Sequence, residues 1–186
     1  MGNSSDAFWW ELLKRYRANF DITENFTLGG KTYPAYAYFF SLGEKYVLKR
    51  EAQLWAVRVY EHVLFIKTKS IDEKFIEQLQ ETIVKHMEPE LVLKGGKCPE
   101  KDHMCSYLSF VVISEETPSK EVEKRINHFY YDKGYRFNFR GHSEAKLAVA
   151  CLDTETALTN YAGRELKQLL TNIFNTLKEG REEKVS

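Results

Sequence analysis

The sequence predicts an α+β fold, with a mainly antiparallel sheet, or two such sheets, and amphipathic helices packed on one face. Two observations carry this prediction. Four segments repeat apolar residues at helical spacing, and the segments between them are short and rich in aromatic and β-branched residues. Because these short segments mostly follow one another in groups, they favour hairpins, and hairpins build antiparallel sheets.

Helices are predicted at residues 6–18, 71–87, 118–131 and 161–177. In each of them the apolar side chains recur every three or four residues and therefore share one face. The first contains the adjacent Trp9 and Trp10, which broaden its apolar face. The second opens with Ser70 and Glu73 at the spacing of a capping box. The third opens with Pro118, which the first turn of a helix tolerates.

Strands are predicted for the aromatic and β-branched stretches at residues 35–42, 44–50, 53–60, 62–68, 107–114, 135–140, 146–153 and 156–160. Hairpin turns are expected around Gly43 and around Thr154. The predicted order is therefore a helix, four strands, a helix, one strand, a helix, three short strands and a last helix.

The stretch LVLKGGKCPEKDHMC, residues 91–105, divides the chain and is expected to be a long loop. The 186 residues suit a single α+β domain, residues 1–186. The alternative is two halves, about 1–90 and 105–180, joined by this loop. Each half has a hairpin block that runs into an amphipathic helix, which indicates an internal structural repeat as one arrangement of the fold.

Charge and cysteine content exclude some classes of protein. The chain has 27 basic and 27 acidic residues, whereas dedicated nucleic-acid binders usually carry a basic excess. No apolar run reaches the roughly 18 residues of a membrane-spanning helix, and the N-terminus does not read as a signal peptide. Three cysteines cannot all pair, which favours a reduced, cytoplasmic protein. We therefore expect no membrane partner and no nucleic-acid partner.

Three longer strings carry a resemblance to a known family. They are GEKYVLKREAQLWAVRVYEHVLF, RGHSEAKLAVACLD and TNYAGRELKQLL. Together they resemble a family of small uncharacterised bacterial proteins that has no assigned activity. The resemblance implies a bacterial, cytoplasmic origin, and it supplies no catalytic residues.

The stretch KGYRFNFR, residues 133–140, begins like the first signature of an RNA-recognition motif. The match fails at Arg136, Asn138 and Arg140, and the stretch follows a helix, whereas the signature belongs on a later strand. If the stretch is a strand, its three aromatic side chains, Tyr135, Phe137 and Phe139, share one face. We expect that face to be buried against helices, with single-stranded nucleic-acid binding through residues 135–139 as an alternative.

Cys98, His103 and Cys105 form the best candidate metal site in the sequence. Thiolates and imidazoles suit zinc, but a structural zinc site needs four ligands. Cys151 or His142 would have to supply the missing ligand from a distance. A charged surface loop with incidental thiols is the favoured interpretation, so no cofactor is expected and zinc is the alternative.

His142 and Glu144 lie two residues apart and would share one face of a strand, where they could act as an acid–base pair. Arg136 and Arg140 have the same alternation and would extend the face into an anion-binding row. No positioned nucleophile completes a catalytic set. The competing interpretation is a solvated strand face with cross-strand ion pairs.

These observations leave the function open and favour a non-enzymatic, cytoplasmic binding or interaction protein over an enzyme. Surplus aromatic surface on the first helix would allow a homodimer. The alternative is a small-molecule or anion-binding, enzyme-like site around Arg140, His142 and Glu144.

Overall fold

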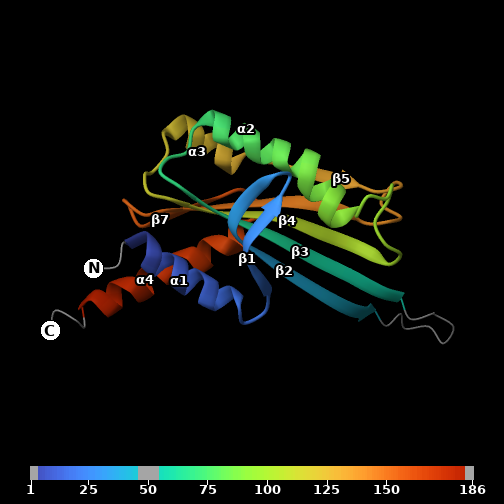
Figure 1. Ribbon diagram of the computed structural model, residues 1–186, viewed down its shortest axis with the longest axis horizontal. Coiled ribbons are helices and arrows are strands. Elements are labelled where there is room, and N and C mark those ends of the chain that lie inside the picture. Colours follow the sequence, from blue (N-terminus) through green and yellow to red (C-terminus); the bar gives the residue numbers. More distant parts are fainter. Residues whose placement is uncertain (1–3, 46–54, 183–186) are drawn as a thin grey trace.

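The computed structural model describes residues 4–45 and 55–182. Within them a seven-stranded mixed sheet is sandwiched between helices (Figure 1). The elements follow in the order α1 (Ser4–Tyr16), β1 (Asp21–Leu28), β2 (Lys31–Lys45), β3 (Trp55–Thr68), α2 (Glu73–Thr82), a π-helix η1 (Ile83–Val92), β4 (His103–Ser114), α3 (Lys120–Asn127), β5 (Asp132–Gly134), β6 (His142–Cys151), β7 (Thr156–Thr159) and α4 (Arg164–Glu182).

The strand order is β1-β2-β3-β4-β6-β5, and β7 also pairs with β6. The three central strands β3, β4 and β6 are parallel to one another, and the remaining pairings are antiparallel. The α+β class is therefore confirmed. Strands from both sides of the predicted dividing loop belong to this one sheet, because β4 pairs directly with β3.

Helices cover both faces of the sheet, so the prediction that they pack on one face is wrong (Figure 1). Helices α2, η1 and α3 pack on one face and α1 and α4 on the other. The cause is visible in the central strands, where neighbouring residues such as Phe110 and Val111 are both buried. Parallel strands covered on both faces read as continuous apolar runs. The helices after the two hairpin blocks, α2 and α4, thus lie on opposite faces, and an internal repeat stays a prediction.

The four helices lie where they were predicted, with different ends. Helix α2 is capped by Asp72, whose carboxylate accepts a hydrogen bond from the Phe75 amide, and not by Ser70. The chain then continues through η1, which contains Pro89. The expected loop 91–105 therefore shrinks to residues 93–102, because η1 ends at Val92 and β4 begins at His103.

The two predicted hairpin turns have different outcomes. The hairpin around Thr154 is confirmed, because β6 and β7 are antiparallel and Cys151 pairs with Thr156 next to the turn. The turn at Gly43 is wrong, since Gly43 lies inside β2 opposite Val57. The connection between β2 and β3 falls in residues 46–54, outside the described residues. Strand β1 was not predicted because its sequence, DITENFTL, is mostly polar and exposed.

Residues 135–140 form a tight turn, so the predicted aromatic strand is wrong. Arg136, Phe137 and Asn138 have left-handed backbone conformations, and the Arg140 amide donates a hydrogen bond to the Tyr135 carbonyl. Tyr135 is buried, whereas Phe137 and Phe139 are 98% and 89% exposed. The three aromatic side chains therefore do not share one buried face, and single-stranded nucleic-acid binding through residues 135–139 stays a prediction.

Candidate functional site

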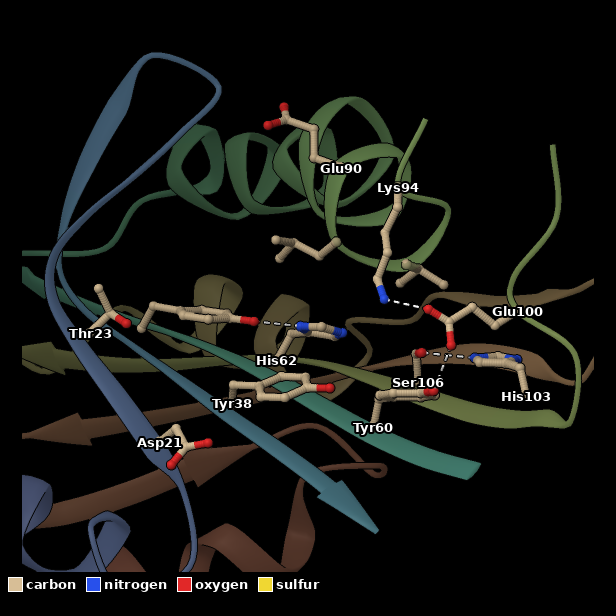
Figure 2. Close-up of a pocket in the computed structure, with 13 residues that line it drawn as sticks. Asp21, Thr23, Tyr38, Tyr60, His62, Glu90, Lys94, Glu100, His103 and Ser106 are labelled. Carbon is tan, nitrogen blue, oxygen red and sulfur yellow. Dashed lines mark hydrogen bonds and ion pairs between the residues drawn. The ribbon is translucent and has the colours of Figure 1, made fainter. Parts of the chain in front are cut away.

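A pocket of about 410 Å³ lies over the amino ends of β3 and β4, on the sheet face that carries α2 (Figure 2). Strand β1, the end of η1 and the loop 93–102 form its other walls. The lining residues are Asp21, Thr23, Tyr36, Tyr38, Tyr60, His62, Glu90, Leu91, Val92, Lys94, Glu100, His103 and Ser106. The pocket thus draws on both halves of the sequence.

Aromatic rings form one wall of the pocket. Tyr36 and Tyr38 come from β2, and Tyr60 and His62 lie beside them on β3. The ring centroids of Tyr38 and His62 are 5.4 Å apart, and those of Tyr38 and Tyr60 are 6.5 Å apart. Since alternate residues of a strand share a face, the spacing of two in each strand puts all four rings on the pocket side.

His62 is the buried polar group of this wall. The Tyr36 hydroxyl and His62 Nδ1 are hydrogen bonded at 2.7 Å. Burial lowers the pKa of His62 to about 4, and the nearby charge of Lys94 acts in the same direction. The imidazole is therefore neutral at pH 7, with one nitrogen that donates and one that accepts.

Two of the carboxylates that line the pocket, Glu100 and Glu90, have basic side-chain partners. Lys94 Nζ donates to Glu100 Oε1 at 2.5 Å, and Arg58 donates to Glu100 Oε2 at 3.1 Å. Figure 2 shows Lys94 and Glu100 meeting above the ring wall. Glu90 in turn is 3.0 Å from His86 Nδ1. Lys94 is the one cationic side chain among the lining residues, and it is already engaged.

His103 and Ser106, both from β4, line the pocket and are hydrogen bonded at 2.8 Å between Nε2 and Oγ. The second ring nitrogen of His103, Nδ1, is 2.8 Å from the Arg140 carbonyl oxygen. A carbonyl only accepts, so Nδ1 carries the proton and Nε2 of the neutral ring accepts from the Ser106 hydroxyl. Burial lowers the pKa of His103 below its usual range and favours this neutral form.

The residues predicted as an acid–base or anion site lie elsewhere. His142 and Glu144 are on one face of β6, as expected. That face of the sheet, which also carries Cys105 and Lys146, is opposite the face with the pocket. Arg136 is exposed in the turn, and Arg140 reaches the pocket region only through its carbonyl oxygen. The four side chains do not line the pocket described above, and their role stays a prediction.

The predicted metal ligands do not gather in one place. Cys105 is buried on the opposite face, with its Sγ 3.5 Å from His142 Nε2. Both nitrogens of His103 already have hydrogen-bond partners. Within residues 4–45 and 55–182, no three His, Cys, Asp or Glu side chains are placed to hold a metal ion.

Sequence reasoning missed the pocket residues Tyr36, Tyr38, Tyr60, His62 and Ser106. The signal for the first pair was present, because in AYAY the tyrosines alternate with alanines that lie fully buried under α1. The pocket forms only when β2 pairs with β3 and η1 packs beside them. These contacts join residues distant in sequence, so local sequence patterns could not predict the pocket.

Comparison with known proteins identifies a family. One family model matches residues 5–172, and its description is a domain of unknown function. Neither the curated proteins nor the solved structures include a match to the chain. Across the described residues, no helix is long and apolar enough to cross a membrane.

Proposed function

The chain belongs to the family of domains of unknown function DUF8052, and since that membership assigns no activity, we propose a function from the pocket alone. We propose that the protein binds a small, planar organic molecule, neutral or cationic, against the ring wall of Tyr36, Tyr38, Tyr60 and His62. The observation that supports this proposal is the convergence of these four rings on one pocket of about 410 Å³.

The size and surface of the pocket suit such a ligand. Pockets for small molecules commonly measure about 300–1,000 Å³ and combine apolar and aromatic walls with a few polar groups. Flat rings gain about 0.5–1.5 kcal/mol from stacking beyond the area they bury. The neutral imidazole of His62 adds a polar group that can orient the ligand without requiring a charge.

The charges disfavour an anionic ligand. Asp21, Glu90 and Glu100 line the pocket, and the single lining cation, Lys94, is bonded to Glu100. A phosphate or carboxylate would have to break that ion pair to find a positive partner. A cationic ring would instead meet tyrosine faces, which attract cations.

The test is saturation-transfer NMR with four fragments, namely phenol, indole, nicotinamide and adenine. We expect at least one to bind the protein, and Tyr38→Ala to weaken its affinity roughly 2- to 10-fold through lost stacking. Tyr161→Ala, which removes a ring that is 78% exposed and outside this pocket, is the matched control. Absence of binding by every fragment, or equal loss in both variants, would contradict the proposal.

A cytoplasmic location is part of the proposal. All three cysteines are free, and Cys105 and Cys151 are buried on opposite faces of the sheet. Free buried thiols are typical of proteins that live in a reducing compartment. Thiol titration of the denatured protein, purified without reductant, should therefore find three thiols per chain; a value near one would indicate a disulfide and an oxidising compartment.

A further inference from the structure

We propose that Ser106 and His103 form a nucleophile–base pair that cleaves a carboxylic ester of the molecule bound in the pocket. This inference rests on the proposed binding function, because Ser106 and His103 line the same pocket as the ring wall. It adds an acyl-transfer activity to a site that otherwise only binds.

A chain of two hydrogen bonds connects three groups at this site. The Ser106 hydroxyl donates to His103 Nε2 at 2.8 Å, and His103 Nδ1 donates to the Arg140 carbonyl at 2.8 Å. Many serine nucleophiles are activated in this order: a hydroxyl, a neutral base and a third group that orients the base. The Arg140 carbonyl takes the third place, where it fixes the tautomer that leaves Nε2 free to accept a proton.

Irregular backbone brings the two side chains together. Residues three apart on a regular strand point to opposite faces. The register between β3 and β4 shifts at this point, since Arg58 is opposite His103 while Val59 is opposite Cys105. The extra residue, Met104, forms a bulge that turns His103 to the face of Ser106. Bulges of this kind often re-aim side chains beside active sites.

The imidazole of His103 is held between two rings. Tyr60 stacks on it with a centroid distance of 5.8 Å, and Tyr135 approaches it edge-on at 5.9 Å. Tyr135 belongs to the same turn as Arg140, so that turn supplies both the orienting carbonyl and one packing ring. Figure 2 shows His103 and Ser106 bonded to each other beside Tyr60, below Glu100.

Burial prepares the pair for reaction. Ser106 is 1% and His103 6% exposed to solvent, and both border the pocket. The lowered pKa of His103 keeps its ring unprotonated at pH 7, as a general base must be. Both residues are shielded from bulk solvent but line the pocket, so their reaction partners would be a bound ester and then a water molecule that enters the pocket after the alcohol has left.

The reaction balances without a cofactor. Ser106 Oγ attacks the ester carbonyl carbon while its proton passes to His103 Nε2, and the carbonyl oxygen becomes an oxyanion. The pocket donors that could stabilise this oxyanion are the Lys94 ammonium and the Tyr60 hydroxyl, and both would have to turn to it from Glu100, to which they are bonded in this structure. The oxyanion collapses, the bond to the leaving oxygen breaks, and that oxygen takes the proton from His103. Water then attacks the acyl-serine in the same way, and a carboxylic acid leaves.

The test uses two small probes on the full chain. Diisopropyl fluorophosphate should add one diisopropylphosphoryl group, mapped to Ser106 by peptide mass spectrometry, and p-nitrophenyl acetate should release p-nitrophenol. We expect Ser106→Ala to lose both signals and His103→Gln to slow both about 100-fold or more, the usual contribution of a general base. Ser109→Ala is the matched control, because Ser109 is buried on the opposite face with its hydroxyl bonded to Glu61.

The outcomes separate this inference from the binding proposal. Folding of each variant is checked by circular dichroism, and fragment binding is measured on Ser106→Ala. A wild-type chain that stays unlabelled, or nitrophenol release that survives Ser106→Ala, would overturn the inference. If the fragments still bind in that case, the binding proposal stands and the hydrogen-bonded pair is structural.

Discussion

Gly141, directly after the turn at residues 135–140, allows the backbone of this turn to lie close to the bulge at Met104. Its φ of +73° is left-handed, and a Cβ built there would lie 2.2 Å from the Met104 carbonyl oxygen and 2.7 Å from that of His103. Only glycine leaves room for the bulge that turns His103. The residue directly before it, Arg140, provides the carbonyl that His103 contacts.

We expect Gly141→Ala to lower the free energy of unfolding by about 3 kcal/mol or more, because left-handed alanine costs about 1–2 kcal/mol and the clash with backbone adds to it. Gly30→Ala is the matched control, since Gly30 has a φ of +75° and open space around its Cβ. Urea denaturation of both variants gives the comparison. Equal losses would show that the close approach to Met104 has no energetic weight.

The protonation of His62 predicts how stability depends on pH. Burial lowers its pKa from 6.5 to about 4, so between these values the unfolded chain binds a proton that the folded chain does not. Stability should therefore be full above pH 6.5 and fall as the pH drops towards 4, by an amount on the order of 3 kcal/mol from this residue. The lowered pKa of His103 acts in the same direction.

Unfolding free energies of wild type and His62→Gln, measured by urea at several pH values, test this expectation. The variant should lose part of the dependence between pH 6.5 and 4, and His128→Gln, at an exposed position, should retain all of it. Parallel curves for wild type and His62→Gln would mean that His62 is not buried in a neutral state.

For single residues, the sequence indicated which side chains are chemically important, but it did not indicate which residues they contact. His103 was singled out as a metal ligand, yet its partners are Ser106 and a backbone carbonyl. Spacing rules place His103 and Ser106 on opposite faces of a regular strand. The bulge that reverses this depends on pairing with β3, which no local pattern reveals.

Among the elements, the turn at residues 135–141 is where local pattern and structure differ most. Alternating aromatic and polar residues predicted a strand, but the chain makes a turn that buries Tyr135 alone. The Tyr135 hydroxyl is 2.8 Å from Ser143 Oγ and donates to Glu88 at 3.4 Å. These contacts to other elements, together with Gly141, decide the conformation.

We therefore expect substitutions of the exposed Phe137 and Phe139 to change the free energy of unfolding much less than substitution of the buried Tyr135. The double variant Phe137→Ser/Phe139→Ser should change the free energy of unfolding by less than about 0.5 kcal/mol, as exposed substitutions usually do. Tyr135→Phe should cost about 1–3 kcal/mol, because it leaves buried partners unsatisfied. Urea denaturation measures both. A larger loss for the phenylalanine pair would restore the buried strand of the sequence prediction.

For the longer elements, prediction succeeded where one pattern runs through many residues. The four helices were found from their apolar periodicity, β4 from its aromatic and β-branched run, and β6 from its run of apolar residues. The side of the sheet that each helix covers was not found. The clue was the two-sided apolar run of the central strands, which indicates helices on both faces. Strand β1, polar and at the sheet edge, had no such signal.

The molecule as a whole is expected to unfold as one unit, because β3 and β4, from either side of the predicted division, pair along eleven positions from Arg58 to Thr68. Tryptophans occur only at positions 9, 10 and 55, so their fluorescence reports the first half of the chain. Circular dichroism reports all elements. We expect coincident urea transitions by the two signals. Separate midpoints would indicate two independently folding halves.

A crystallographic fragment screen would show whether the ring-walled pocket holds a small planar ligand. Crystals of the full chain would be soaked with a library of flat heterocycles and simple aromatic amines. We expect bound fragments to gather between Tyr38, Tyr60 and His62, with rings parallel to the tyrosines and a hydrogen bond to the imidazole. Fragments that bind only elsewhere, or a pocket that keeps nothing but water through the whole library, would contradict it.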